Sequence, residues 1–224
     1  GHLADFLSEF AWSPAVDFSD FEGTLKVTTD GSIAATVIQT RPGQFATLPV
    51  VPINSPVQTL PIPPLYGGEM QSQARTYNLL MQDGSKEFIE GLLAPTSGYN
   101  GDYLGPTLLM KKGDQVVLNV TNQLDERTST HWHGLHVPAA MDGGPHQMIG
   151  SGETWTASFP VLNRAATYWY HPHLHPSPGQ GAIFEPTGTG YQVYRGLAGM
   201  IIIEDGTSDT LALPRSYGQD DIPL

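Results

Sequence analysis

The chain has 224 residues, with 10 Lys and Arg against 22 Asp and Glu, so its formal net charge at pH 7 is −12. So acidic a chain is a poor partner for nucleic acids and for anionic membranes, which both attract basic surfaces. The length is sufficient for a buried hydrophobic core, and the absence of cysteine excludes disulfides and thiolate metal ligands.

The N-terminal part predicts one hairpin and a connector. Residues 24–40 alternate polar and apolar positions around Asp30-Gly31, a pair typical of a tight β-turn. Residues 49–64 are rich in proline, which fixes φ and removes a backbone donor, so an extended connector is expected there. We therefore expect residues 1–55 to form an N-terminal extension.

The chain from about residue 65 to residue 205 is typical of an all-β protein. Several segments alternate apolar and polar residues or are rich in β-branched and aromatic residues, as strands are. The predicted strands are residues 115–122, 153–161, 166–171 and 198–205. Turn residues separate them and no long segment has helical periodicity, which favours a sandwich or barrel. The residues predicted to lie in or near the core are Leu118, Val120, Trp155, Phe159 and Ile202.

Five of the 8 histidines lie in two short stretches, HWHG at residues 131–134 and HPHLH at residues 171–175. Residues i and i+2 of a strand point to the same face, with Cα atoms about 6.5 Å apart. Each pair can therefore bind one ion or bridge two ions, and imidazole suits copper, zinc, iron and nickel. A single His-x-His pair is often coincidental, but two pairs in β-like contexts favour a metal site.

Longer motifs around these histidines carry a resemblance to a known family. The chain reads HWHGLHVPAAMDGGPHQMI at residues 131–149, ATYWYHPHLH at 166–175 and GLAGMIIIED at 196–205. In this order they resemble the first domain of multicopper oxidases, in particular the branch of bacterial cuprous oxidases, bilirubin oxidases and spore-coat laccases. Residues 59–65 and 100–124 are similar to that family too, so the resemblance covers roughly residues 57–224.

The resemblance implies a fold and a domain organisation. Multicopper oxidases are built from three cupredoxin domains, each a Greek-key β-sandwich. We therefore expect a first cupredoxin domain at residues 56–205 and a linker at residues 206–224 that leads to a second domain missing from this chain.

The resemblance also implies roles for individual residues. His131 resembles a ligand of the type 2 copper, His133 and His171 resemble ligands of one type 3 copper, and His173 resembles a ligand of the other. Asp142 resembles a carboxylate beside the type 2 copper that helps to deliver protons to dioxygen, although Asp-Gly is also a common turn former. The other cluster ligands and the type 1 copper are implied to lie in a C-terminal domain, because a chain without cysteine has no thiolate for a type 1 site.

Other residues near the motifs predict structural roles. We expect Trp132 to point away from the face of its two histidine neighbours and to pack, as Tyr168 and Tyr170 do. The glycine- and proline-rich residues 176–195 predict a surface loop. Surface, core or loop positions without metal ligation are expected for His136, His146 and His175.

The predicted function is the N-terminal part of a laccase-like multicopper oxidase, which oxidises a phenol, a bilirubin-like pigment or a metal ion and reduces O₂ to water. Its partners would be the other cupredoxin domains, O₂ and the reductant, and the chain alone is expected to be inactive. A periplasmic or secreted location is expected, with any signal peptide removed. Alternatives are a non-enzymatic cupredoxin scaffold, disfavoured because all four histidines are present, and a stand-alone copper-binding module.

Overall fold

The computed structural model describes residues 37–41, 44–48, 60–174 and 188–224. The chain divides into two compact units, residues 1–60 and residues 61–224. In the first unit, β1 (Val37–Arg41) pairs antiparallel with β2 (Gln44–Leu48). The predicted turn at Asp30-Gly31 and most of the proline-rich connector lie outside the described residues.

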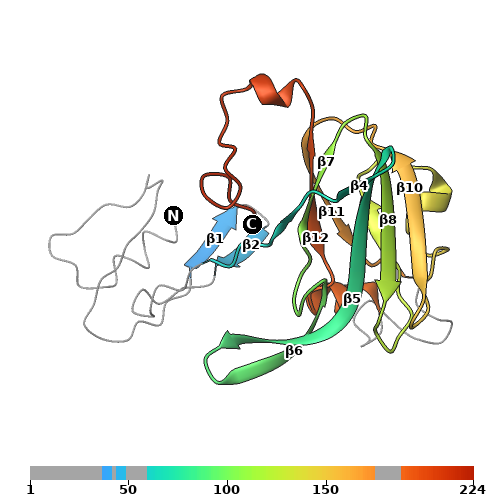
Figure 1. The fold of residues 1–224 in the computed structure, drawn as a ribbon. Helices are drawn as coiled ribbons and strands as arrows, with labels where there is room; N and C mark the ends of the chain where they lie inside the picture. Colours follow the sequence, from blue (N-terminus) through green and yellow to red (C-terminus); the bar gives the residue numbers. More distant parts are fainter. Residues whose placement is uncertain (1–36, 42–43, 49–59, 175–187) are drawn as a thin grey trace, which may run out of the picture. The chain divides into compact units, whose positions relative to one another are not determined.

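The second unit is a sandwich of two five-stranded sheets (Figure 1). One sheet has the order β10-β8-β5-β4, with β6 also paired to β5, and the other has the order β3-β7-β12-β11-β9. Strands β4, β5 and β6 follow one another as antiparallel hairpins. In the parallel pairs of β5 with β8 and of β7 with β3 and β12, by contrast, the chain crosses between strands. The prediction of an all-β, cupredoxin-type sandwich is therefore confirmed.

The elements of this unit have the following bounds. The first sheet contains β4 (Glu69–Gln71), β5 (Ala74–Ile89), β6 (Leu92–Tyr99), β8 (Gln115–Asn122) and β10 (Thr154–Pro160). The second contains β3 (Leu65–Tyr66), β7 (Thr107–Lys111), β9 (His131–His133), β11 (Ala166–His171) and β12 (Gly199–Glu204). The helical turns are η1 (Ala139–Met141), α2 (Thr189–Tyr194) and η2 (Ser208–Thr210).

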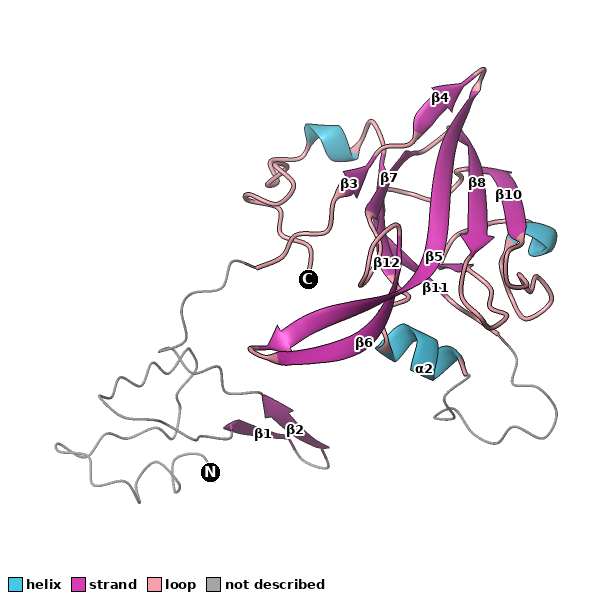
Figure 2. Cartoon of the chain, turned by 60° about the horizontal axis from the view of Figure 1, so that its bottom comes forward, coloured by secondary structure: helices cyan, strands magenta, loops and turns pink. Residues whose placement is uncertain are grey.

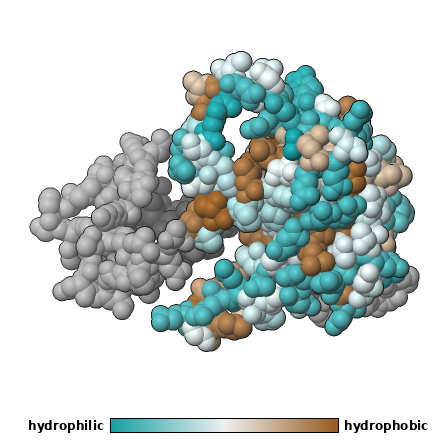
Figure 3. All heavy atoms as spheres, viewed as in Figure 1, coloured by the Kyte–Doolittle hydropathy of each residue, from teal (hydrophilic) through white to brown (hydrophobic). Residues whose placement is uncertain are grey.

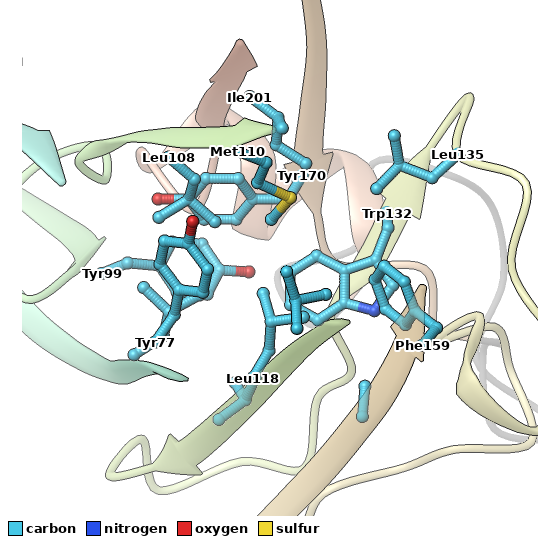
Figure 4. Packing of buried hydrophobic residues seen from close by; sticks show 14 of the residues in the cluster. Tyr77, Tyr99, Leu108, Met110, Leu118, Trp132, Leu135, Phe159, Tyr170 and Ile201 are labelled. Atoms are coloured by element: carbon cyan, nitrogen blue, oxygen red, sulfur yellow. The ribbon is translucent and has the colours of Figure 1, made fainter. Parts of the chain in front are cut away.

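The core fills the space between the two sheets, where alternate residues of each strand meet (Figure 4). Leu118, Val120 and Phe159 are buried and Trp155 packs against them, as predicted. Ile202 is half-buried and lies near the core on the other face of β12, and its neighbours Ile201 and Ile203 are the buried residues. A run of three isoleucines contains no alternation from which the inward face could be chosen.

Strands β5 and β6 continue past the sandwich as a projecting two-stranded arm (Figure 2). Its far end is exposed on both faces and carries Phe88, Ile89, Leu92 and Leu93. On the face drawn in Figure 3, hydrophilic residues cover most of the unit, with hydrophobic residues scattered among them.

The predicted loop at residues 176–195 and the C-terminal tail contain structure that the sequence did not predict. Residues 176–187 of the predicted surface loop 176–195 lie outside the described residues, but Thr189–Tyr194 form α2, so the loop prediction is wrong there. In the C-terminal tail, the Tyr217 hydroxyl donates to the carbonyl of Pro63 at 2.8 Å and lies 2.6 Å from the Thr107 hydroxyl, which ties the tail to the sandwich. Within the described ranges, no helix is long and apolar enough to cross a membrane.

Candidate metal centre

The two histidine pairs come together because their strands are neighbours at one edge of a sheet. Strand β9 pairs antiparallel with β11, and His131 lies directly opposite His171. Residues directly opposite in an antiparallel pair share a face, so His131, His133 and His171 present their imidazoles on the side of the sheet away from the core. Trp132 lies between the first two histidines and is fully buried on the core side, as predicted.

The four imidazoles form one cluster. The ring centroid of His131 lies 5.6 Å from that of His133, 5.6 Å from that of His171 and 5.2 Å from that of His173. His173 follows the end of β11, where its backbone N–H donates to the Ser129 hydroxyl at 2.9 Å. The convergence of the pairs on one face, expected from their spacing, is thus observed.

These imidazoles do not form a closed cage. Among the described residues, no group of three or more His, Asp or Glu side chains is arranged to hold one metal ion. The tightest pair is His133 with His171, whose Nδ1 and Nε2 atoms are 3.0 Å apart. Two nitrogens of one metal ion, each about 2.0–2.1 Å from it, have a similar separation.

Two backbone carbonyls set which ring nitrogens carry the proton. The Nδ1 atom of His131 lies 2.8 Å from the carbonyl oxygen of Asp142, and the Nδ1 atom of His171 lies 2.6 Å from the carbonyl oxygen of Pro172. A carbonyl only accepts, so each Nδ1 carries the proton and each Nε2 keeps its lone pair. Such carbonyl contacts are typical of metal-binding histidines, which they hold in one tautomer and orientation.

The environment of His171 keeps its imidazole neutral. The pKa of His171 is lowered from 6.5 to about 4, mainly by burial and also by the neighbouring histidines, while the Pro172 carbonyl opposes the shift. Only a neutral imidazole has a lone pair for a metal. His171 is therefore ready to bind a metal even in mildly acidic solution, and imidazole donors of this kind fit copper.

Asp142 lies beside the cluster at the end of η1. Its carboxylate oxygen is 3.4 Å from the Nδ1 atom of His131, so the expectation that it lies near the cluster holds. The position depends on the next residue, Gly143, which has φ of +72°, and a Cβ atom there would come 1.6 Å from the carbonyl oxygen of Thr130. Only glycine lets the chain pass this close to β9.

Trp169 belongs to the cluster, although the sequence reasoning did not include it. Its ring stacks on His171 at a centroid distance of 3.9 Å and on His133 at 5.0 Å. The signal was present, because Trp169 and His171 are two residues apart in one strand and so share a face. The remaining histidines play no part in the described cluster: His136 and His146 are exposed, and His175 lies outside the described residues.

Comparisons with known proteins agree with this site. The family model described as multicopper oxidase matches residues 81–208. The "Multicopper oxidase mco" of Staphylococcus aureus is 45% identical over 67% of this chain and 31% of its own length. The "Cell division protein FtsP" of Salmonella typhimurium is 39% identical over 75% of this chain and 33% of its own.

A solved structure with a similar fold is the laccase-like multicopper oxidase CueO of Ochrobactrum sp., described as having oxidase activity towards lignin model compounds and lignosulfonate. It is 41% identical with a TM-score of 0.65, over 74% of this chain and 34% of that one. The present chain thus spans about a third of the length of these relatives. From the matched residues, the identities and the shared sandwich, we conclude that the chain belongs to the multicopper oxidase family.

Proposed function

We propose that this chain supplies half of the histidine ligands of a trinuclear copper cluster, in a protein that couples one-electron oxidation of a reducing substrate to reduction of O₂ to water. In this proposal His131 binds the type 2 copper, His133 and His171 bind one type 3 copper, and His173 binds the other. Other domains of the same protein provide the remaining ligands and the type 1 copper. Bound copper would supply the one-electron chemistry.

One observation carries the proposal, namely that four imidazoles cluster where β9 and β11 are neighbours: His131, His133 and His171 come from these strands, and His173 comes from the residues just after β11. Two of the four have Nδ1 held by a carbonyl. If this chain supplies only half of the ligands of a shared site, its imidazoles need not surround a single ion. This agrees with the distances of 5–6 Å between neighbouring ring centroids and with the absence of a three-ligand group among the described residues. A mononuclear site would instead need three or four ligands around a single point.

The chain's own residues have distinct tasks in this reaction. The carbonyls of Asp142 and Pro172 orient His131 and His171, and Trp169 covers the ring faces of His133 and His171. The Asp142 carboxylate, next to His131, is suited to hold and pass on protons, which the reduction of O₂ to water consumes. The reductant is a phenol, a bilirubin-like pigment or a metal ion, and the protein is periplasmic or secreted.

A non-enzymatic scaffold is the second candidate, favoured by the relatives named as cell division proteins. The two functions differ in what they require of the histidines. A scaffold needs only the sandwich, whereas the oxidase needs the four imidazoles, which lie on the outer face and contribute nothing to the core cluster.

Copper binding by the chain tests the proposal directly. We expect Cu(II) titration, followed by electron paramagnetic resonance, to show nitrogen-ligated copper that is weakened at least about tenfold in His131→Ala and in His133→Ala, as loss of a metal contact typically does. The exposed His136→Ala is the matched control and should bind copper as the parent chain does. Equal binding by all variants would rule out the cluster and favour the scaffold.

Activity is measured on the complete protein and on this chain alone. Oxygen uptake with a phenol, bilirubin and Cu(I) or Fe(II) should occur only with the complete protein and should stop in His173→Ala. Asp142→Asn should keep its copper but turn over more slowly, because an amide does not pass protons on. Sustained oxygen uptake by residues 1–224 alone would show that this chain holds a whole site.

A further inference from the structure

Trp132 has a feature that packing does not explain. It is fully buried, and its indole N–H has no hydrogen-bond acceptor among the described residues. Nearly all buried polar groups in proteins are paired, and one reason for an exception is a redox role. Trp132 follows His131 directly and precedes His133, so only single peptide units separate it from two candidate copper ligands.

The Trp132 ring is part of a series of aromatic rings. It stacks on Trp155 with a centroid distance of 6.2 Å and an angle of 14° between the planes. On another side it lies 6.2 Å from Tyr170, whose ring is 4.9 Å from that of Tyr99. Figure 4 shows Trp132 and the two tyrosines within the same core. Of these four rings, only that of Trp155 is partly exposed.

Electron transfer from Tyr170 and Tyr99 to Trp132 is unfavourable. A phenol that gives up an electron must also give up its proton, but the Tyr170 hydroxyl donates to the carbonyl of Pro106, which is not a base. The Tyr99 hydroxyl faces the Thr130 hydroxyl at 3.1 Å, which is no base either.

The indole of Trp132 differs in this respect. An indole can lose an electron and persist as a radical cation, and the Trp132 N–H proton has no described group to move to. A radical cation that keeps its proton remains a strong oxidant and takes an electron from an adjacent ring. The parallel contact with Trp155 provides such a ring, with access to water.

We propose that Trp132 and Trp155 form an electron relay that removes oxidising equivalents from the histidine cluster and delivers them to the protein surface. The relay rests on the proposed function, because the oxidant arises at copper bound by the histidines. The oxidant takes one electron from Trp132, and Trp155 then gives one electron to Trp132, which becomes neutral again. The Trp155 radical cation releases its N–H proton to water.

The relay has a chemical product that can be detected. Two successive transfers, with one water molecule, convert Trp155 to hydroxytryptophan and release two electrons and two protons. The oxygen atom in this product comes from water. The benefit to the protein is that the metal-binding imidazoles are spared, since oxidation ends on a ring that does not touch the cluster.

The test uses the chain loaded with Cu(II), with ascorbate and hydrogen peroxide, under argon in isotopically labelled water. Ascorbate reduces the copper, and Cu(I) gives one electron to the peroxide, which splits into hydroxide and a hydroxyl-radical oxidant. That oxidant becomes hydroxide when it takes an electron from Trp132. Peptide mass spectrometry then locates the label on each tryptophan.

We expect labelled oxygen on Trp155 in the parent chain. In Trp132→Phe the label on Trp155 should fall to the background of the His131→Ala/His133→Ala double variant. Trp169 is the internal control, because it stacks directly on His171 and should be oxidised in both proteins. Equal labelling of Trp155 with and without Trp132 would overturn the relay.

A second variant covers the case in which Trp132→Phe does not fold. Trp155→Phe lies at the partly exposed end of the pair, and in it oxidation should accumulate on Trp132. No increase at Trp132 would contradict the relay. Absence of copper-dependent oxidation at Trp169 as well would overturn the copper site itself, whereas oxidation of Trp169 with Trp155 spared overturns the relay alone.

Discussion

At the scale of single residues, the histidine side chains of the cluster can be predicted from the sequence, whereas the backbone groups that orient them cannot. The histidine pairs are visible as His-x-His spacing, and the strand geometry explains their common face. The carbonyl acceptors of Asp142 and Pro172 are not visible, because every residue has a carbonyl and only the path of the chain selects one. Gly143 marks that path, but a glycine in DGGP is equally typical of an ordinary turn.

His171 makes the stability of the metal-free chain depend on pH. Its pKa is lowered to about 4 by burial, so between this value and the ordinary 6.5 the unfolded chain binds a proton that the folded chain does not. The stability of the folded chain is therefore unaffected by this group above about pH 6.5. As the pH falls from 6.5 towards 4, the free energy of unfolding decreases, by on the order of 3 kcal/mol at most. We expect the free energy of unfolding in urea to decrease over this range.

A substitution separates the pH dependence due to His171 from that due to Asp and Glu side chains, which also bind protons at low pH. His171→Phe removes the titrating group and should flatten the dependence of the unfolding free energy on pH. His136→Gln, at an exposed position, should leave it unchanged. Parallel curves for the parent chain and His171→Phe would show that His171 does not stay neutral in the folded chain.

At the scale of strands, prediction succeeded for strands whose pattern is uninterrupted and failed where a turn-like pair of residues lies within a strand. Strands β8, β10, β11 and β12 alternate or are strongly apolar, and the predicted ranges agree with them to within one residue at each end. Strand β5 was not predicted, because its Asp83-Gly84 pair has the composition of a turn. Gly84 does not form a turn but allows close packing against the strand, since a Cβ atom at this position would come 2.5 Å from the backbone of Asp102.

The inward face of β12 allows a matched test. Ile201 is fully buried and pairs with Tyr168 of β11 and Leu108 of β7, whereas Ile202 is half-buried on the opposite face. Ile201→Ala should lower the free energy of unfolding by about 2–5 kcal/mol, because it leaves a cavity. Ile202→Ala should cost clearly less, and chemical denaturation of the two variants gives the comparison. A larger loss in Ile202→Ala would reverse the assigned faces.

At the scale of the whole chain, every residue of the core cluster and of the histidine cluster lies in residues 61–224. We therefore expect a chain shortened to residues 61–224 to unfold cooperatively and to bind Cu(II) with the affinity of the longer chain. Circular dichroism dominated by β-structure and a copper titration would verify this. Loss of copper binding on removal of residues 1–60 would mean that the first unit contributes to the site.

The side chains of β9 alternate between the candidate metal-binding face and the core, and this alternation affects which changes the protein tolerates during evolution. The histidines lie on one side and Trp132 on the other, so a lineage can replace the histidines one by one and keep an intact sandwich. Insertion or deletion of one residue in β9 is different, because a shift by one position exchanges the two faces. Descendants of this domain can therefore lose the metal by substitution and survive as folded proteins, but the length of this strand is inherited unchanged.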